Sequence, residues 1–230
     1  MTPTRDHELR HQPTQSPPPG TPAELETLLP EHAAAWLTGA RAQLREDADT
    51  VDGLFAVAAR RCGRDAAAGA NAAGWTVDDA VRALLLASLP LRGAELATVV
   101  TRLYQVGGAA ERRAVLRALP LLERSADLGD RALPLVEDAL RTNDLRLIAA
   151  AVGPYGARHL DAHSFRHAVL KCVFVGIPLA GVSGLADRAD TELTRMMADF
   201  ATERRAAARP VPPDVLAFLD THPAPTEAST

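Results

Sequence analysis

The sequence of 230 residues has few aromatic residues, few cysteines and almost no lysine. Phe, Trp and Tyr together make up 4% of the chain, whereas alanine and leucine are abundant, and this bias favours closely packed helices over sheets. The two cysteines, Cys62 and Cys172, are too few for a disulfide framework and lack the spacing of a metal site. Arginine supplies all but one of the 25 basic residues, so Lys171 is the only lysine.

The chain also lacks an excess of positive charge and a long apolar run. Its net charge is −4 and its basic residues occur only in short pairs, which argues against a nucleic-acid partner because such proteins usually carry strong positive charge. The longest apolar run, residues 172–182, is far shorter than the roughly 20 residues needed to cross a bilayer. The N-terminal segment has no apolar stretch of the signal-peptide kind. We therefore expect a cytoplasmic protein without a membrane-spanning helix.

Proline-rich segments flank the part of the chain that we expect to fold. Residues 1–22 contain six prolines, with polar residues between them. Such a composition cannot bury enough apolar surface to offset the entropy lost on ordering. Residues 221–230 have a similar composition. The sequence thus predicts a disordered tail over 1–22, one folded domain over 23–220, and a second disordered tail over 221–230.

Nearly every segment of the predicted domain has the apolar spacing of a helix, and no segment has the alternation of a strand. The phrase Leu-Pro-Leu occurs at 89–91, 119–121 and 133–135. Its irregular spacing does not establish a repeat, but it fits stacked helix pairs in which prolines bend or start helices. The predicted fold class is a single all-α domain of stacked helix pairs that resembles a HEAT-like α-solenoid. Helices are expected at about 33–45, 51–62, 77–88, 93–106, 145–152, 165–179, 190–209 and 215–219.

The most apolar stretch, residues 165–179, is expected to form one helix around which the rest of the chain packs, and Pro178, which follows Gly176, is expected to end it. Lys171 lies in it, and His167 and His163 precede the lysine at intervals of four, on the same flank. A lysine in such a helix pairs with a carboxylate, extends to the surface, or acts as a base or imine-forming amine. Pairing is the preferred interpretation, and a lysine that faces a ligand is the main alternative. The candidate carboxylates are Asp187, Asp199 and Glu203.

Histidines four residues apart can bind a metal ion from one face of a helix, so His163 and His167 are an alternative metal site. No acidic residue lies between them as in zinc proteases, and chance spacing on a solvated flank is preferred, so no metal is expected. No phosphate-binding loop or nucleophile elbow occurs, and no cofactor is expected. Residues 141–144 fit a helix end followed by a cap, and Arg195 and Asp199 fit a surface ion pair.

Three ordered stretches resemble the EboA-domain family. They are EDALRTN at 137–143 running into GPY at 153–155, then HAVLKCVF at 167–174, and the polar pattern of 185–209. The resemblance covers roughly residues 80–217. It departs from the family at His167, where an amide side chain is expected, and at the variable segment 176–179.

The resemblance implies an accessory role. Family members are encoded in clusters with a prenyltransferase-like membrane protein, a dehydroquinate-synthase-like enzyme and a TIM-barrel metal-dependent protein, and these clusters are associated with maturation or export of secondary metabolites. The family has no agreed catalytic residues. The polar positions shared with it are candidate ligand-binding residues: Arg141, Asn143, Tyr155, Lys171, Arg195 and Asp199.

Two functions follow from these observations. The first is a binding or scaffold protein that holds a small-molecule intermediate or partner enzymes, including the membrane-bound prenyltransferase-like protein, on a helical surface. The alternative is a cofactor-independent enzyme in which Lys171, with His167 or a carboxylate, performs proton transfer or imine chemistry. The groups within hydrogen-bond reach of the lysine amine distinguish the two.

Overall fold

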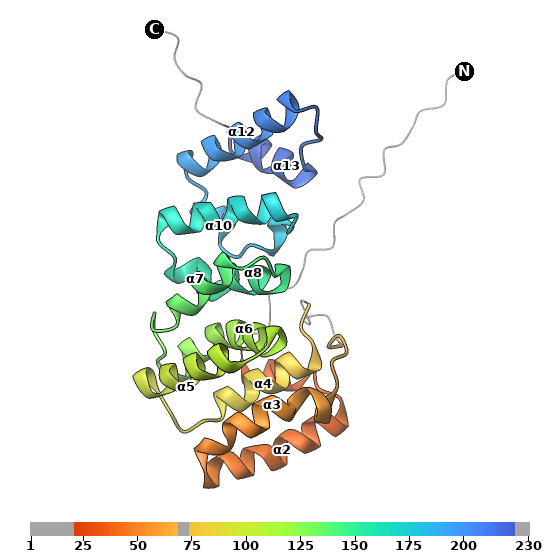
Figure 1. Ribbon diagram of the computed structural model, residues 1–230, viewed down its shortest axis with the longest axis vertical. Helices are drawn as coiled ribbons and strands as arrows, with labels where there is room; N and C mark the ends of the chain where they lie inside the picture. The colour runs from red at the N-terminus through yellow and green to blue at the C-terminus, as the bar shows by residue number, and fades with distance from the viewer. Residues whose placement is uncertain (1–20, 69–73, 224–230) are drawn as a thin grey trace, which may run out of the picture.

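The structure is a computed structural model that describes residues 21–68 and 74–223. Figure 1 shows helices stacked in successive layers, from α2 and α3 at one end to α12 and α13 at the other. Within the described residues there is no strand, and only an isolated bridge joins Ala66 and Thr76. The all-α prediction is therefore confirmed.

Each of the eight predicted helices overlaps a described α-helix, and five further α-helices in the described residues had no predicted bounds. The α-helices are α1 (Pro22–Glu26), α2 (Glu31–Glu46), α3 (Val51–Cys62), α4 (Val77–Ala87), α5 (Gly93–Val106), α6 (Ala109–Ala126), α7 (Leu133–Arg141), α8 (Leu145–Ala151), α9 (Pro154–His159), α10 (Ala162–Val175), α11 (Leu185–Arg188), α12 (Thr191–Ala206) and α13 (Pro213–Thr221). Two 3-10 helices are η1 (Ala48–Thr50) and η2 (Leu179–Gly181). The predictions for 51–62 and 93–106 are confirmed at both ends.

Both ends of the described chain belong to helices. Thr21 caps α1 with its hydroxyl, which accepts a hydrogen bond from the Glu24 amide, while the Glu24 carboxylate accepts one from the Thr21 amide. Of this capping box, Thr21 lies in the segment 1–22 that composition assigned to a tail, and Glu24 lies in the predicted domain. Thr221, the first residue of the predicted tail 221–230, is the last residue of α13. The remainder of the predicted tails, 1–20 and 224–230, lies outside the described residues.

The three Leu-Pro-Leu phrases serve three different purposes. The first follows the end of α4, the second places Pro120 inside α6, and the third places Pro134 in the first turn of α7. A proline is tolerated in a first turn because the amide it lacks would have no helical partner there. The phrase thus marks no structural repeat.

The most enclosed element is α4, not the helix of the most apolar stretch. Ten of the eleven residues of α4 are buried, because it packs against α1, α2, α3 and α6. By contrast α10 lies between α8 and α12, and its Phe174 side chain is 63% exposed. The prediction that residues 165–179 form the centre of the molecule is therefore wrong.

The same stretch also ends as a helix earlier than predicted. Gly176 adopts the left-handed conformation, with φ of 78°, and the Ile177 amide donates to the Cys172 carbonyl at 2.8 Å. This arrangement is a Schellman-type helix end, which glycine permits at little conformational cost. Residues 177–184 then fold back irregularly through η2, so Ile177, Leu179 and Val182 are buried without extending the helix.

Candidate functional site

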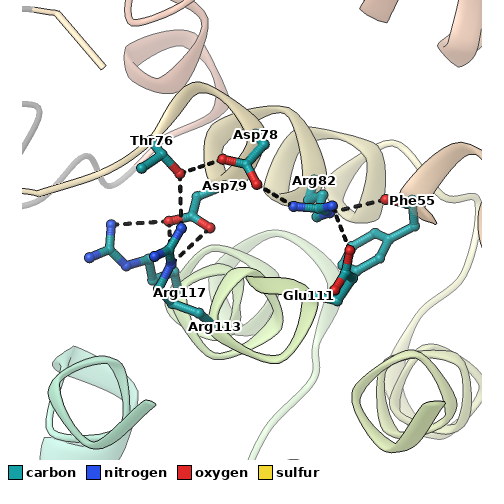
Figure 2. A network of polar contacts seen from close by, with 8 residues as sticks. All are labelled: Phe55, Thr76, Asp78, Asp79, Arg82, Glu111, Arg113 and Arg117. Carbon is teal, nitrogen blue, oxygen red and sulfur yellow. Dashed lines mark hydrogen bonds and ion pairs between the residues drawn. The ribbon is translucent and has the colours of Figure 1, made fainter. Parts of the chain in front are cut away.

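A buried cluster of charged side chains joins α3, α4 and α6 (Figure 2). Arg82 of α4 is completely buried and uses its whole guanidinium group. Its Nη1 donates to Asp78 Oδ2 at 2.5 Å, its Nη2 to Glu111 Oε1 at 2.8 Å, and its Nε to the Phe55 carbonyl at 3.0 Å. Buried charges need such partners because water no longer solvates them.

Asp79 forms the second half of the cluster. Its Oδ1 accepts a hydrogen bond from Arg113 Nε at 3.2 Å. Its Oδ2 lies 2.9 Å from the same Nε and 3.4 Å from Arg117 Nη1, as ion-pair contacts without hydrogen-bond geometry. Burial raises the pKa of the Asp79 carboxyl, and the charges of Arg117 and Arg113 oppose this rise.

The cluster is electrically balanced, since three guanidinium groups meet three carboxylates. It therefore has no net charge with which to attract an ionic ligand, and its role is to join the helices. Thr76 also takes part: its hydroxyl donates to Asp78 Oδ1 at 2.6 Å and accepts from Arg113 Nη2 at 3.1 Å. Thr76 directly precedes α4, but its side chain makes no capping hydrogen bond to the backbone of the helix.

Lys171 has backbone partners instead of a carboxylate. Its Nζ donates to the Leu140 carbonyl at 2.5 Å and to the Thr142 carbonyl at 2.7 Å. Both carbonyls belong to the C-terminal end of α7, where the last carbonyl groups lack helical partners and carry partial negative charge. The lysine thus fastens α10 to the end of α7. The prediction that it pairs with Asp187, Asp199 or Glu203 is wrong.

A hollow of about 440 Å³ lies between α7 and α10 beside this contact. It brings together four of the residues selected from the sequence: Arg141, His163, His167 and Lys171. The rings of the two histidines lie with their centroids 4.3 Å apart. Within the described part of the chain, no group of three or more His, Cys, Asp or Glu side chains is arranged to hold a metal ion.

The other candidate residues lie elsewhere. Tyr155 is buried, and its hydroxyl donates to the Gly129 carbonyl at 2.7 Å and accepts from the Ala132 amide at 3.1 Å, so it fastens α9 to the start of α7. Burial raises its pKa to about 12. Asn143 lies exposed in the turn between α7 and α8.

Two local sequence interpretations are confirmed. Arg141 is the last residue of α7, and Asp144 caps α8 by accepting a hydrogen bond from the Arg146 amide at 2.9 Å. On the exposed face of α12, Arg195 pairs with Asp199 at 2.6 Å and also with Glu192 at 2.7 Å. A hollow of about 250 Å³ separates Arg195 from the histidines of α10.

A larger hollow, of about 900 Å³, lies between the C-terminal end of α10, the folded-back segment and α13. We call it the α13 groove. Asp214 Oδ2 accepts a hydrogen bond from the Leu179 amide at 2.9 Å and so ties η2 to α13. The lining is Val173, Gly176, Ile177, Pro178, Leu179, Ala180, Val182, Gly184, Leu185, Ala186, Asp187, Pro212, Pro213, Asp214, Ala217, Phe218, Thr221 and His222.

An adjoining hollow of about 620 Å³ lies between α10 and the end of α12, and we call it the α12 hollow. It shares Val173, Gly176 and Pro212 with the α13 groove. Sequence reasoning missed both hollows, because it treated the apolar residues after Gly176 as part of a helix. Gly176 and Pro178 do signal the end of the helix, but they do not indicate the hollows that form beyond it.

The comparisons with known proteins give one match. A family model described as "Metabolite traffic protein EboA" matches residues 56–220, which is more than half of the chain. Neither the curated proteins nor the solved structures contain a match. None of the described helices combines the length and the apolarity that a membrane crossing requires. The matched range begins within α3 and ends within α13, and it includes the charged side chains of the cluster, Lys171, the α12 hollow and the lining of the α13 groove except Thr221 and His222. The chain therefore belongs to the EboA family.

Proposed function

We propose that the protein binds an apolar small-molecule metabolite in the α13 groove. The observation that carries the proposal is the groove itself, which has a volume of about 900 Å³ and a mainly apolar lining. Small-molecule sites commonly have volumes of about 300–1,000 Å³ and similarly apolar walls. The family description, which concerns metabolite traffic, supports the same conclusion. In this role the protein is an accessory factor in secondary-metabolite maturation or export that holds an intermediate for partner enzymes.

The contacts of Lys171 favour binding over the enzymatic alternative. An imine-forming lysine needs a free amine with access to the substrate carbonyl. The Lys171 amine instead donates to two carbonyls of α7, which is a structural task. Lys171 lines the hollow beside α7 and is not among the residues that line the α13 groove. The proposed binding site therefore does not use it.

A neutral, environment-sensitive dye, N-phenyl-1-naphthylamine, tests the proposal by fluorescence titration. Ala217 is exposed on α13 and lines the groove, so Ala217→Trp fills the site without entering the core. Ala206 is exposed at the end of α12 and lines neither hollow, so Ala206→Trp is the matched control.

The expected result is saturable binding that weakens about tenfold or more in Ala217→Trp, equivalent to at least about 1.4 kcal/mol, and stays unchanged in Ala206→Trp. Absence of saturable binding, or equal affinities of the two variants, would overturn the proposal. Urea unfolding of both variants shows whether a loss of binding comes from a filled groove or from an unstable protein.

A further inference from the structure

The α13 groove and the α12 hollow adjoin each other at Gly176. Both hollows are lined by this glycine, by Val173 and by Pro212. A Cβ atom placed on Gly176 would meet no other atom within 4 Å, so the junction is open space at this point. A ligand longer than the groove can therefore extend along the end of α10 into the second hollow.

The two hollows differ in chemical character. Side chains of the α13 groove are mainly apolar, whereas the α12 hollow contains Arg204, Arg209 and one carboxylate, that of Glu203. The arginines outnumber the carboxylate, so the α12 hollow has a net positive charge. Phe174 and Phe200 also line it and contact each other edge to face, with ring centroids 5.0 Å apart. An apolar chain can thus pass over the two rings before it reaches the guanidinium groups.

Arg204 is held in place for such an interaction. Its Nε and Nη2 donate to the Pro210 carbonyl at 3.0 and 2.8 Å, and its guanidinium lies 5.9 Å from the centre of the Phe200 ring. Its Nη1 group takes no part in these bonds. Arg209 lines the same hollow, and its backbone amide donates a hydrogen bond to the Arg204 carbonyl at 2.8 Å. Guanidinium groups bind carboxylate and phosphate oxygens through paired hydrogen bonds.

We infer that the ligand is an anionic amphiphile, with its apolar body in the α13 groove and a phosphate or carboxylate head group in the α12 hollow beside Arg204 and Arg209. This inference rests on the proposed function. The α13 groove instead carries the carboxylates of Asp187 and Asp214, and Asp214 accepts hydrogen bonds from the Leu179 and Val215 amides. The charges of the two hollows thus orient the anionic end towards α12.

Competition against the bound dye tests the inference with a matched set of ligands, each kept below its critical micelle concentration. The set is dodecyl phosphate, dodecanoate, dodecanol and dodecylammonium, which share one apolar chain. Arg209→Gln removes a head-group contact, and Arg205→Gln is the control, since Arg205 is exposed and lines neither hollow. Arg204 is left intact because it also fastens Pro210.

The expected result is that an anionic ligand binds about three- to fivefold more tightly than dodecanol, as for a partly exposed ion pair, and that dodecylammonium binds most weakly. Arg209→Gln should remove most of this preference and Arg205→Gln none of it. Added salt should narrow the difference in the unaltered protein, a readout that needs no variant. The better of the two anions identifies the head group.

Two outcomes overturn the inference in different ways. If dodecanol displaces the dye as well as the anions do, the head-group site is refuted while the proposed function stands. If no member of the set displaces the dye and the dye itself does not bind, the proposed function fails as well.

Discussion

Replacement of Arg82 by methionine should destabilise the fold more than most single substitutions. The variant removes the 2.5 Å ion pair with Asp78 and the 3.0 Å hydrogen bond to the Phe55 carbonyl, and both acceptors are then left without this donor in the interior. Breaking a buried ion pair on one side costs about 3–5 kcal/mol, because the remaining charge is neither paired nor hydrated. The lost ion pair with Glu111 adds less to the loss of stability, because the Glu111 side chain is partly exposed and can be hydrated.

The loss should be measured by urea unfolding. Trp75 is a suitable fluorescent reporter because it is buried and lies beside Arg117 of the same cluster, with the guanidinium 5.4 Å from the centre of its ring. A loss of about 3–5 kcal/mol is a large share of the roughly 5–15 kcal/mol that stabilises a typical domain. The measurement should therefore be made at low temperature, where the variant is still folded.

A double variant separates the lost ion pair from lost packing. In Asp78→Leu with Arg82→Met, no unpaired charge remains between the two positions, so much of the stability should return. Asp78→Leu alone serves as the second arm of the double-mutant cycle. The reasoning is refuted if Arg82→Met costs less than about 1 kcal/mol, the size of an exposed ion pair, or if the double variant is no more stable than the single one.

Three further predictions concern α10 and α8. Lys171→Met should lower the free energy of unfolding in urea by about 1–3 kcal/mol, because two carbonyls at the end of α7 lose their donor. The variant should leave dye binding unchanged, and weakened binding would show that Lys171 belongs to the binding site. Purified protein should hold no stoichiometric zinc by elemental analysis, because His163 and His167 have no third ligand among the described residues; one zinc per chain, lost in the double alanine variant, would contradict this. The Asp144 pKa is lowered to about 2, first by its hydrogen bond from the Arg146 side chain, so its contribution to stability is present above about pH 4 and is lost as the pH falls towards 2. Asp144→Asn should therefore lower the urea midpoint at pH 7 and have little effect near pH 2; equal losses at both pH values would refute the assignment.

Helical periodicity and local end signals were sufficient for much of the fold. The bounds of α3 could be predicted because an apolar stripe ends where Gly63 follows, and those of α5 because Gly107 follows. The end of α10 was placed too late, because Ile177 and Leu179 continue the apolar pattern after Gly176 has reversed the backbone. Apolar spacing indicates which residues are buried but not whether the helix still connects them.

The charged cluster and the lysine contact show a second limit. Asp78 and Arg82 have the spacing of a helical ion pair, but the sequence does not indicate that α6 supplies Glu111 to the same guanidinium. For Lys171 the sequence indicates the need for acceptors, yet the acceptors are backbone carbonyls, one of them 31 residues away. Backbone groups carry no sequence signal of their own. The α13 groove escaped prediction for the same reason, since its walls come from segments that only the fold brings together.

The layered arrangement has a consequence for hydrogen exchange. In the N-terminal part of the stack, α4 is packed on several sides, whereas α12 and α13 at the other end (Figure 1) pack mainly on each other, on α10 and on η2. In a stacked helical array, local stability follows from the interfaces with neighbouring layers, so a terminal layer opens at a lower free energy than the middle. We expect the amide hydrogens of α12 and α13 to exchange earlier than those of α4. Such opening would give a bound molecule an exit from the α13 groove while the rest of the array stays folded.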